Sequence, residues 1–109
     1  MSLAKLGGIP FSEFLTFNDL DKNHTIMPGQ VYYYNHKENK ASVHFHIVRS
    51  GDTWWSVSQK YGIKKKALLI KNRLHCEVPL KPGRVLWLRF IRPRKIPIAY
   101  VHLPFNTAQ

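Results

Sequence analysis

The sequence predicts an α+β fold: a strand, two helices and a second strand follow one another over residues 44–88, after a partial unit of one helix and one strand. Three observations lead to this prediction. A strand runs into a capped helix, a second helix ends before a turn and a strand, and part of the chain resembles itself at a shift of 54 residues. We expect both helices to pack on one face of a two-stranded antiparallel sheet.

The first strand and the first helix are joined by a short turn. An alternating run ends at Val48, and Ser50-Gly51-Asp52-Thr53 follows it. Apolar or small residues then recur from Trp54 at the i, i+3, i+4 and i+7 positions of a helix face. We therefore predict a strand over 44–48 and a helix over 53–61. The Asp52 carboxylate is expected to cap this helix and Gly62 to end it.

The second half of the unit has a helix, an irregular loop and a strand. Residues 64–72 have helix-forming residues, and the three lysines at 64–66 are expected on the solvated side. Lys81-Pro82-Gly83 reads as a turn before a strand over 85–88. In that strand Leu86 and Leu88 are expected to point inward.

The N-terminal third repeats this second half. At the shift of 54, Ile9 falls on Ile63, and the register continues without a gap as far as Tyr34 on Leu88. Matching pairs at this shift are Gly8 with Gly62, Leu15 with Leu69, Asn18 with Asn72, Leu20 with Leu74, and Pro28-Gly29 with Pro82-Gly83. Similarity at a fixed period indicates duplicated units. We predict a helix near 10–17, with Pro10 in its first turn, and a strand near 31–34.

The chain thus divides into a partial unit at 1–35, a linker or hairpin loop at 36–43, a complete unit at 44–89 and an extended tail at 90–109. The hairpin is slightly favoured over the linker, because the strand of the partial unit needs a partner or a cover. Pro93, Pro97 and Pro104 exclude a helix and a central strand from the tail. An edge strand over 96–101 is compatible with them.

Residues 45–88 resemble the lysin motif, or LysM, family. The matching positions are Val48, Gly51-Asp52-Thr53, Trp55, Val57-Ser58, Tyr61-Gly62-Ile63, Leu68, Asn72, Leu74, Leu80-Lys81-Pro82-Gly83, Leu86 and Leu88. Three residues depart from the family pattern. Ser50 replaces a usual proline, Trp54 a usual leucine and His46 a usual aromatic residue.

The resemblance implies a shallow groove between the strand-to-helix loop and the helix-to-strand loop, which holds N-acetylglucosamine-containing glycans of peptidoglycan or chitin. An acetamido group offers one donor, one acceptor and a methyl group, and Leu74, Val78 and Pro79 are suited to line an apolar notch for that methyl. Trp54 is assigned mainly to the core, whereas the role of Trp55 stays open. The candidate glycan-binding residues are Gly51, Asp52, Thr53, Trp54, Arg73, Leu74, His75, Cys76, Val78 and Pro79.

Other chemistries have little support in the sequence. The single cysteine, Cys76, cannot form an intrachain disulfide, and we interpret it as a free loop thiol rather than a nucleophile activated by His75. His44 and His46 share a strand face, but the spacing indicates no third metal ligand. No carboxylate pair suits acid–base catalysis, so we predict a non-enzymatic chain without cofactor or metal. No run approaches the roughly 18 apolar residues of a membrane span.

Two functions from different classes remain open. Seventeen basic against six acidic side chains give a net charge of +11. This charge is interpreted either as solvated faces, which we favour, or as attraction to nucleic acid or anionic envelope polymers. The favoured function is a non-catalytic module that targets a larger envelope protein, such as a peptidoglycan hydrolase, to peptidoglycan. The alternative is a basic module that binds nucleic acid or an anionic protein. Of these two partners, nucleic acid has the weaker support. A location in the cell envelope or outside the cell is expected, with any signal sequence upstream.

Overall fold

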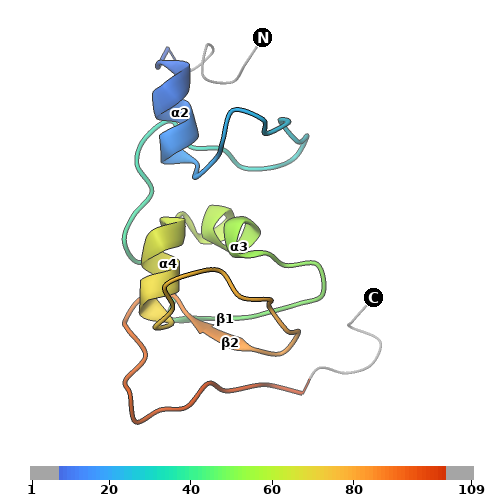
Figure 1. Ribbon diagram of the computed structural model, residues 1–109, viewed down its shortest axis with the longest axis vertical. Helices are drawn as coiled ribbons and strands as arrows, with labels where there is room; N and C mark the ends of the chain where they lie inside the picture. Colours follow the sequence, from blue (N-terminus) through green and yellow to red (C-terminus); the bar gives the residue numbers. More distant parts are fainter. Residues whose placement is uncertain (1–7, 103–109) are drawn as a thin grey trace.

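The computed structural model of the chain describes residues 8–102. The predicted domain parts at 1–7 and 103–109 lie outside the described residues. The elements in chain order are α2 (Phe11–Phe17), β1 (Phe45–Ile47), α3 (Trp54–Tyr61), α4 (Lys65–Lys71) and β2 (Val85–Trp87). In Figure 1, α2 and the loop after it form one part, and the two strands with α3 and α4 form the other. This order confirms the predicted α+β fold.

The complete unit is built on a two-stranded sheet. β1 and β2 pair antiparallel, with His46 opposite Leu86. Leu86 and Leu88 are fully buried, as predicted. The other buried hydrophobic residues of this core are Ala41, Val48, Trp54, Val57, Ile63 and Leu68. Both helices therefore cover one face of the sheet through a single apolar core.

The cap of α3 differs from the prediction. Thr53, not Asp52, is the N-cap residue: its Oγ1 accepts a hydrogen bond from the Ser56 amide at 3.0 Å, and the Ser56 Oγ accepts one from the Thr53 amide at 2.9 Å. This reciprocal pair is a capping box in which serine takes the place of glutamate. Asp52 does not cap the helix, because its Oδ2 pairs with His46 Nε2 at 2.8 Å. Gly62 ends the helix with φ of 66°, as predicted.

The partial unit repeats the complete unit in its helix. α2 and α4 are 54 residues apart at both ends. The asparagine after each helix bonds backward and forward in the same way. Asn18 Nδ2 donates to the Phe14 and Tyr33 carbonyls, at 2.9 and 2.8 Å. Asn72 Nδ2 donates to the Leu68 and Trp87 carbonyls, at 2.8 and 3.0 Å.

The strand predicted near 31–34 is wrong. This segment lies beside Asn18, whose Oδ1 accepts the Tyr33 amide at 2.7 Å, but it belongs to neither strand of the sheet. The physical reason is that the partial unit has no first strand within the described residues to complete a ladder. Side chains satisfy the backbone of this segment instead: Gln59 Nε2 donates to the Val31 carbonyl at 2.9 Å.

The hairpin expected around 36–43 is also absent from the described residues. The segment runs from the partial unit to the sheet along the complete unit instead (Figure 1). The Glu38 amide donates to the Gly62 carbonyl at 2.8 Å, and the Lys64 amide donates to Glu38 at 2.9 Å. The Ala41 amide then reaches the Leu88 carbonyl at 2.9 Å. These bonds fix the segment against the α3–α4 turn and the end of β2.

The proline-containing tail returns to the sheet. Arg84 and Tyr100 form an antiparallel bridge. The Val85 amide donates to the Ala99 carbonyl at 2.9 Å, and the Val101 amide donates to Gly83 at 2.7 Å. The tail thus pairs with the outer edge of β2 over the last part of the predicted 96–101 segment, as a bridge rather than a full strand.

The partial unit docks on the side of α3 that faces away from the sheet. Trp55 Nε1 donates to the Asn18 carbonyl at 2.7 Å, and the Tyr33 hydroxyl donates to the Gln59 carbonyl at 2.6 Å. Buried Lys37 adds an ion pair with Asp19 at 2.7 Å and a hydrogen bond to Gln59 Oε1 at 2.7 Å. Trp55, whose role the sequence left open, is therefore a contact between the two units.

Candidate functional site

A shallow groove lies between the two loops that the sequence singled out. The β1–α3 loop contributes Asp52, Thr53 and Trp54, and the α4–β2 loop contributes the other wall. Its volume is about 340 Å³, and the residues of the second wall are Glu77, Val78, Pro79 and Leu80. Five of the predicted glycan-binding residues thus come together here. Glu77 and Leu80 were not among the predictions, although both lie in the predicted loop.

Trp54 fixes the distance between the two walls. Its ring is buried in the core, as predicted, while its Nε1 donates to the Val78 carbonyl at 2.6 Å. Arg84 lies behind the ring, with its guanidinium carbon 5.8 Å from the ring centroid. A residue larger than the usual leucine therefore joins the core to the far wall of the groove through one hydrogen bond.

A chain of hydrogen bonds orients the Asp52 carboxylate at the groove. His46 Nε2 pairs with Asp52 Oδ2 at 2.8 Å, and His46 Nδ1 with the Tyr61 hydroxyl at 2.7 Å. The Arg49 amide donates to the same Asp52 oxygen at 2.9 Å. Because both of the bonds made by the Asp52 carboxylate involve Oδ2, Oδ1 is the oxygen available to accept a hydrogen bond from a ligand. In the sequence, the departure of His46 from the family pattern is the one sign of this role.

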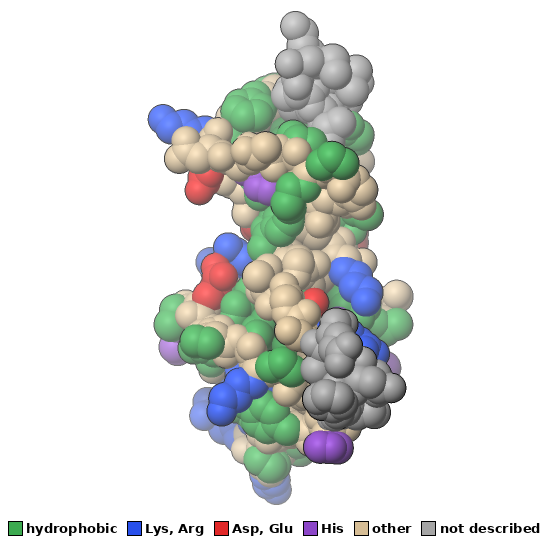
Figure 2. Space-filling model, turned by 90° about the vertical axis from the view of Figure 1, so that its right-hand side faces the viewer, with side chains coloured by type: hydrophobic (Ala, Val, Ile, Leu, Met, Phe, Trp, Pro, Cys, Tyr) green, Lys and Arg blue, Asp and Glu red, His purple; other side chains and the backbone are tan. Residues whose placement is uncertain are grey.

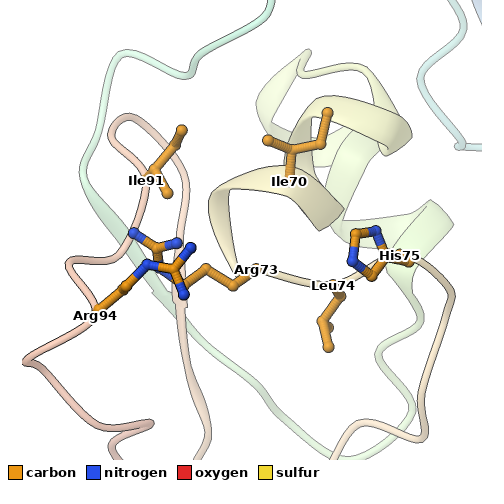
Figure 3. A pocket seen from close by; sticks show the side chains of 6 residues that line it. All are labelled: Ile70, Arg73, Leu74, His75, Ile91 and Arg94. Atoms are coloured by element: carbon orange, nitrogen blue, oxygen red, sulfur yellow. The ribbon is translucent and has the colours of Figure 1, made fainter.

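A second depression contains three of the remaining predicted residues. Arg73, Leu74 and His75 line a hollow of about 310 Å³ at the C-terminal end of α4, together with Ile70, Ile91 and Arg94. Figure 3 shows the guanidinium groups of Arg73 and Arg94 extending toward each other, with His75 on the other side. We call this hollow the arginine depression. The predicted site is therefore split between two surfaces.

The last two predicted residues, Gly51 and Cys76, line neither hollow. Both are exposed, and Cys76 is a free thiol. Within residues 8–102, no group of three or more histidine, cysteine or acidic side chains is placed to hold a metal ion. His44 and His46 also differ in burial, because His44 is exposed and His46 is buried. No helix in the described part of the chain is long and apolar enough to cross a membrane.

Residues 46–89 match the LysM domain family. Together with the strand-helix-helix-strand order and the groove between its loops, this match confirms the predicted resemblance, and these residues are a LysM domain. The domain is a binding domain rather than a catalytic one, and it implies recognition of N-acetylglucosamine-type glycans. LysM domains occur in extracellular or cell-wall-associated proteins.

Among solved structures, the chain is similar to the spore cortex-lytic enzyme SleL of Bacillus cereus, with 27% sequence identity and a TM-score of 0.40. The alignment covers 81% of this chain and 19% of the enzyme, so the chain spans about a fifth of the length of that protein. No curated protein matches the chain.

Proposed function

We propose that the LysM domain binds the N-acetylglucosamine-containing strands of peptidoglycan in the groove between the β1–α3 and α4–β2 loops. The observation that supports this proposal is the set of contacts that hold the groove open. Trp54 ties one wall to the core and to Val78 on the other wall. In this role the domain is the targeting part of a larger envelope protein, such as a peptidoglycan hydrolase.

The chemistry of the groove suits an acetamido sugar. Val78, Pro79 and Leu80 offer an apolar surface for the acetyl methyl group, and the Asp52 carboxylate offers an acceptor for a sugar hydroxyl or an amide hydrogen. Glu77, the other carboxylate of the groove, is paired with Lys65 at 2.8 Å. Small-ligand sites commonly combine a mostly apolar wall with a few placed polar groups.

Binding assays with and without salt test this proposal. We expect the chain to bind soluble N-acetylglucosamine oligomers with an affinity that changes little between low and high salt, because the ligand is neutral. Pro79→Asp should abolish this binding by placing a charge on the apolar wall. Pro97→Asp is the matched control, since Pro97 is an exposed proline of the tail and does not line the groove.

The net charge of +11 motivates the alternative, a basic module for nucleic acid or an anionic protein. Figure 2 shows Lys and Arg side chains spread over both parts of one face, between hydrophobic and uncharged groups, rather than gathered in one patch. Phosphate binding weakens steeply with salt. Binding to a polymer that survives Pro79→Asp but disappears at high salt would replace the glycan proposal with this alternative.

A further inference from the structure

The arginine depression has a counterpart in the partial unit. A hollow of about 410 Å³ is lined by Leu15, Thr16, Asp19, Leu20, Asp21 and Lys65. Four of its positions correspond, at the shift of 54 residues, to positions of the arginine depression. The pairs are Thr16 with Ile70, Asp19 with Arg73, Leu20 with Leu74, and Asp21 with His75.

The two hollows also share a backbone conformation. Asp19 and Arg73 are the residues with positive φ outside glycine in the described chain, at 53° and 59°. After them, the Leu20 amide donates to the Leu15 carbonyl at 2.9 Å, and the Leu74 amide donates to the Leu69 carbonyl at 3.0 Å. The end of each helix therefore presents the side chain of its left-handed residue in the same way.

In the partial unit, the left-handed residue at the helix end is the acidic Asp19, and it binds hydrogen-bond donors. Asp19 Oδ2 pairs with the Lys37 ammonium at 2.7 Å and accepts the Lys65 backbone amide at 2.9 Å. In the complete unit the polarity is reversed, because Arg73 and His75 replace Asp19 and Asp21. The tail adds Arg94, and no carboxylate lines the arginine depression.

The tail is held in place to form one wall of this depression. The Arg92 amide donates to the Lys71 carbonyl at 2.8 Å, and Arg92 Nη1 donates to Ile96 at 2.6 Å. Arg73 Nε donates to the Arg92 carbonyl, which leaves the terminal nitrogens of its guanidinium toward the hollow (Figure 3). Ile70 and Ile91 add apolar surface, and both are about half exposed, at 47% and 48%.

We propose that the arginine depression binds the carboxylate of a short aliphatic peptide, such as the alanine-terminated peptides of peptidoglycan. Two guanidinium groups match the planar geometry of a carboxylate. The apolar side chains of Ile70, Leu74 and Ile91 favour a ligand with alanine methyl groups over a phosphodiester, which is surrounded by polar groups. The source of the peptide rests on the proposed glycan function, whereas the carboxylate chemistry does not.

A titration of the whole chain tests the carboxylate chemistry directly. N-acetyl-alanyl-alanine is compared with its C-terminal amide and with inorganic phosphate, and chemical shifts of the arginine side chains and of the Ile70 and Ile91 methyl groups are followed. We expect the acid to bind and the amide to bind about tenfold more weakly, as loss of a charge-assisted hydrogen bond predicts. Binding of the amide as tight as that of the acid, or tighter binding of phosphate, would overturn the proposal.

Two matched variants separate a site from a general charge effect. Arg94→Gln removes a guanidinium that lines the depression, and Lys95→Gln removes the same charge one residue away, on an exposed side chain outside it. We expect Arg94→Gln to weaken binding of the acid about tenfold and Lys95→Gln to leave it unchanged. An equal loss of binding in both variants would show that the acid responds to the overall positive charge of the surface, and it would contradict the proposed site.

A polymer assay separates this proposal from the proposed function. We expect Arg94→Gln to lower retention on peptidoglycan with intact peptides, but not on peptidoglycan stripped of its peptides or on chitin. Pro79→Asp should lower retention on all three polymers. If the chain fails to bind oligomers in the groove but still binds the dipeptide acid, the glycan function fails and the carboxylate site stands. An effect of Arg94→Gln on stripped peptidoglycan equal to that on the intact polymer would count against a peptide ligand.

Discussion

Two buried asparagines connect the parts of each repeat at the level of single residues. Asn18 and Asn72 follow their helices, and each exchanges two hydrogen bonds with the backbone of a residue 15 positions later, Tyr33 or Trp87. The amide side chain thereby offers the same donor and acceptor that the backbone of a neighbouring strand would offer. This explains why residues 31–34 lie next to the end of α2 without belonging to a sheet.

Two glycines with similar backbone angles lie in different surroundings, which yields a paired prediction. Gly51 has φ of 91° and open space around its missing side chain, whereas a Cβ on Gly83, at φ of 95°, would lie 2.4 Å from the Val101 carbonyl oxygen. We expect Gly51→Ala to destabilise the chain by about 1 kcal/mol through backbone strain alone. Gly83→Ala should cost more and should detach the tail from β2. Urea denaturation of both variants, with proteolysis of the tail, measures this difference, and equal losses of stability would contradict it.

The capping of α3 shows where residue-level prediction from sequence stops. Asp52 and Thr53 both carry oxygen acceptors that can cap a helix, and they are neighbours. The choice depends on His46, which lies six residues earlier on β1 and binds the Asp52 carboxylate. A contact between two elements thus decides a local feature, and neither helix propensity nor the turn sequence contains that information.

At the scale of elements, α3 serves both units. Trp54 and Val57 face the core of the LysM domain, while Trp55 and Gln59 bind the partial unit. The helix therefore packs against a partial unit whose own described residues contain a single helix, α2. Gln59 is fully buried by this arrangement, although it lies on the side of α3 opposite the sheet.

The buried lysine between the units predicts a pH dependence. Burial lowers the pKa of the Lys37 ammonium from its ordinary 10.5; the ion pair with Asp19 opposes this shift, and nearby Lys65 adds to it. Between the lowered pKa and 10.5 the unfolded chain binds more protons than the folded chain, so Lys37 makes the free energy of unfolding rise with pH across that window. Lys37→Met should lack this rise.

Lys37→Met should also destabilise the chain at pH 7 by about 1 to 3 kcal/mol, because it leaves Asp19 and Gln59 Oε1 without their buried partner. Burial raises the pKa of Tyr33, which works in the opposite direction above pH 10, but that contribution is common to both proteins and cancels in their difference. Lys22→Met, at an exposed lysine, is the control. Parallel stability curves of wild type and Lys37→Met from pH 8 to 10.5 would contradict the lowered pKa.

The sequence predicted the elements of the complete unit to within one residue at each end. Hydrophobic periodicity, a glycine after α3 and the Lys81-Pro82-Gly83 turn are local signals, and they place both helices and β2. The failed strand at 31–34 has the same local signals. Its state depends on whether a partner strand exists, which no pattern within those four residues encodes.

At the scale of the whole molecule, the candidate site was predicted only in part. The two loops of the groove follow from the family resemblance, and five of the ten predicted residues line it. The positions of Ile91 and Arg94 next to Arg73 could not be predicted, because they depend on how a tail without regular structure folds back onto α4. Spacing in sequence gives no information on such a return.

The described chain has one groove of the LysM type, since the partial unit lacks the loop that would form the opposite wall. A single shallow site buries little ligand surface, so we predict weak binding of soluble oligomers. A tandem of two whole chains joined by a flexible linker should be retained on peptidoglycan about 10² to 10⁴ times more strongly. Retention assays compare the tandem with the single chain at equal groove concentration, and a tandem with Pro79→Asp in one copy serves as the control. Equal retention of the tandem and the single chain would remove the argument from multivalency.

Because α3 packs against both units, it determines the order in which parts of the molecule can unfold. Opening of α2 and its loop exposes Trp55 and Gln59 but leaves the LysM core closed, whereas opening of α3 removes a wall from both units at once. Local opening in proteins occurs in such cooperative segments, and their free energies of opening differ. We therefore expect the partial unit to exchange its amide hydrogens first, and the amides of α3 to be protected to at least the level of those in α2.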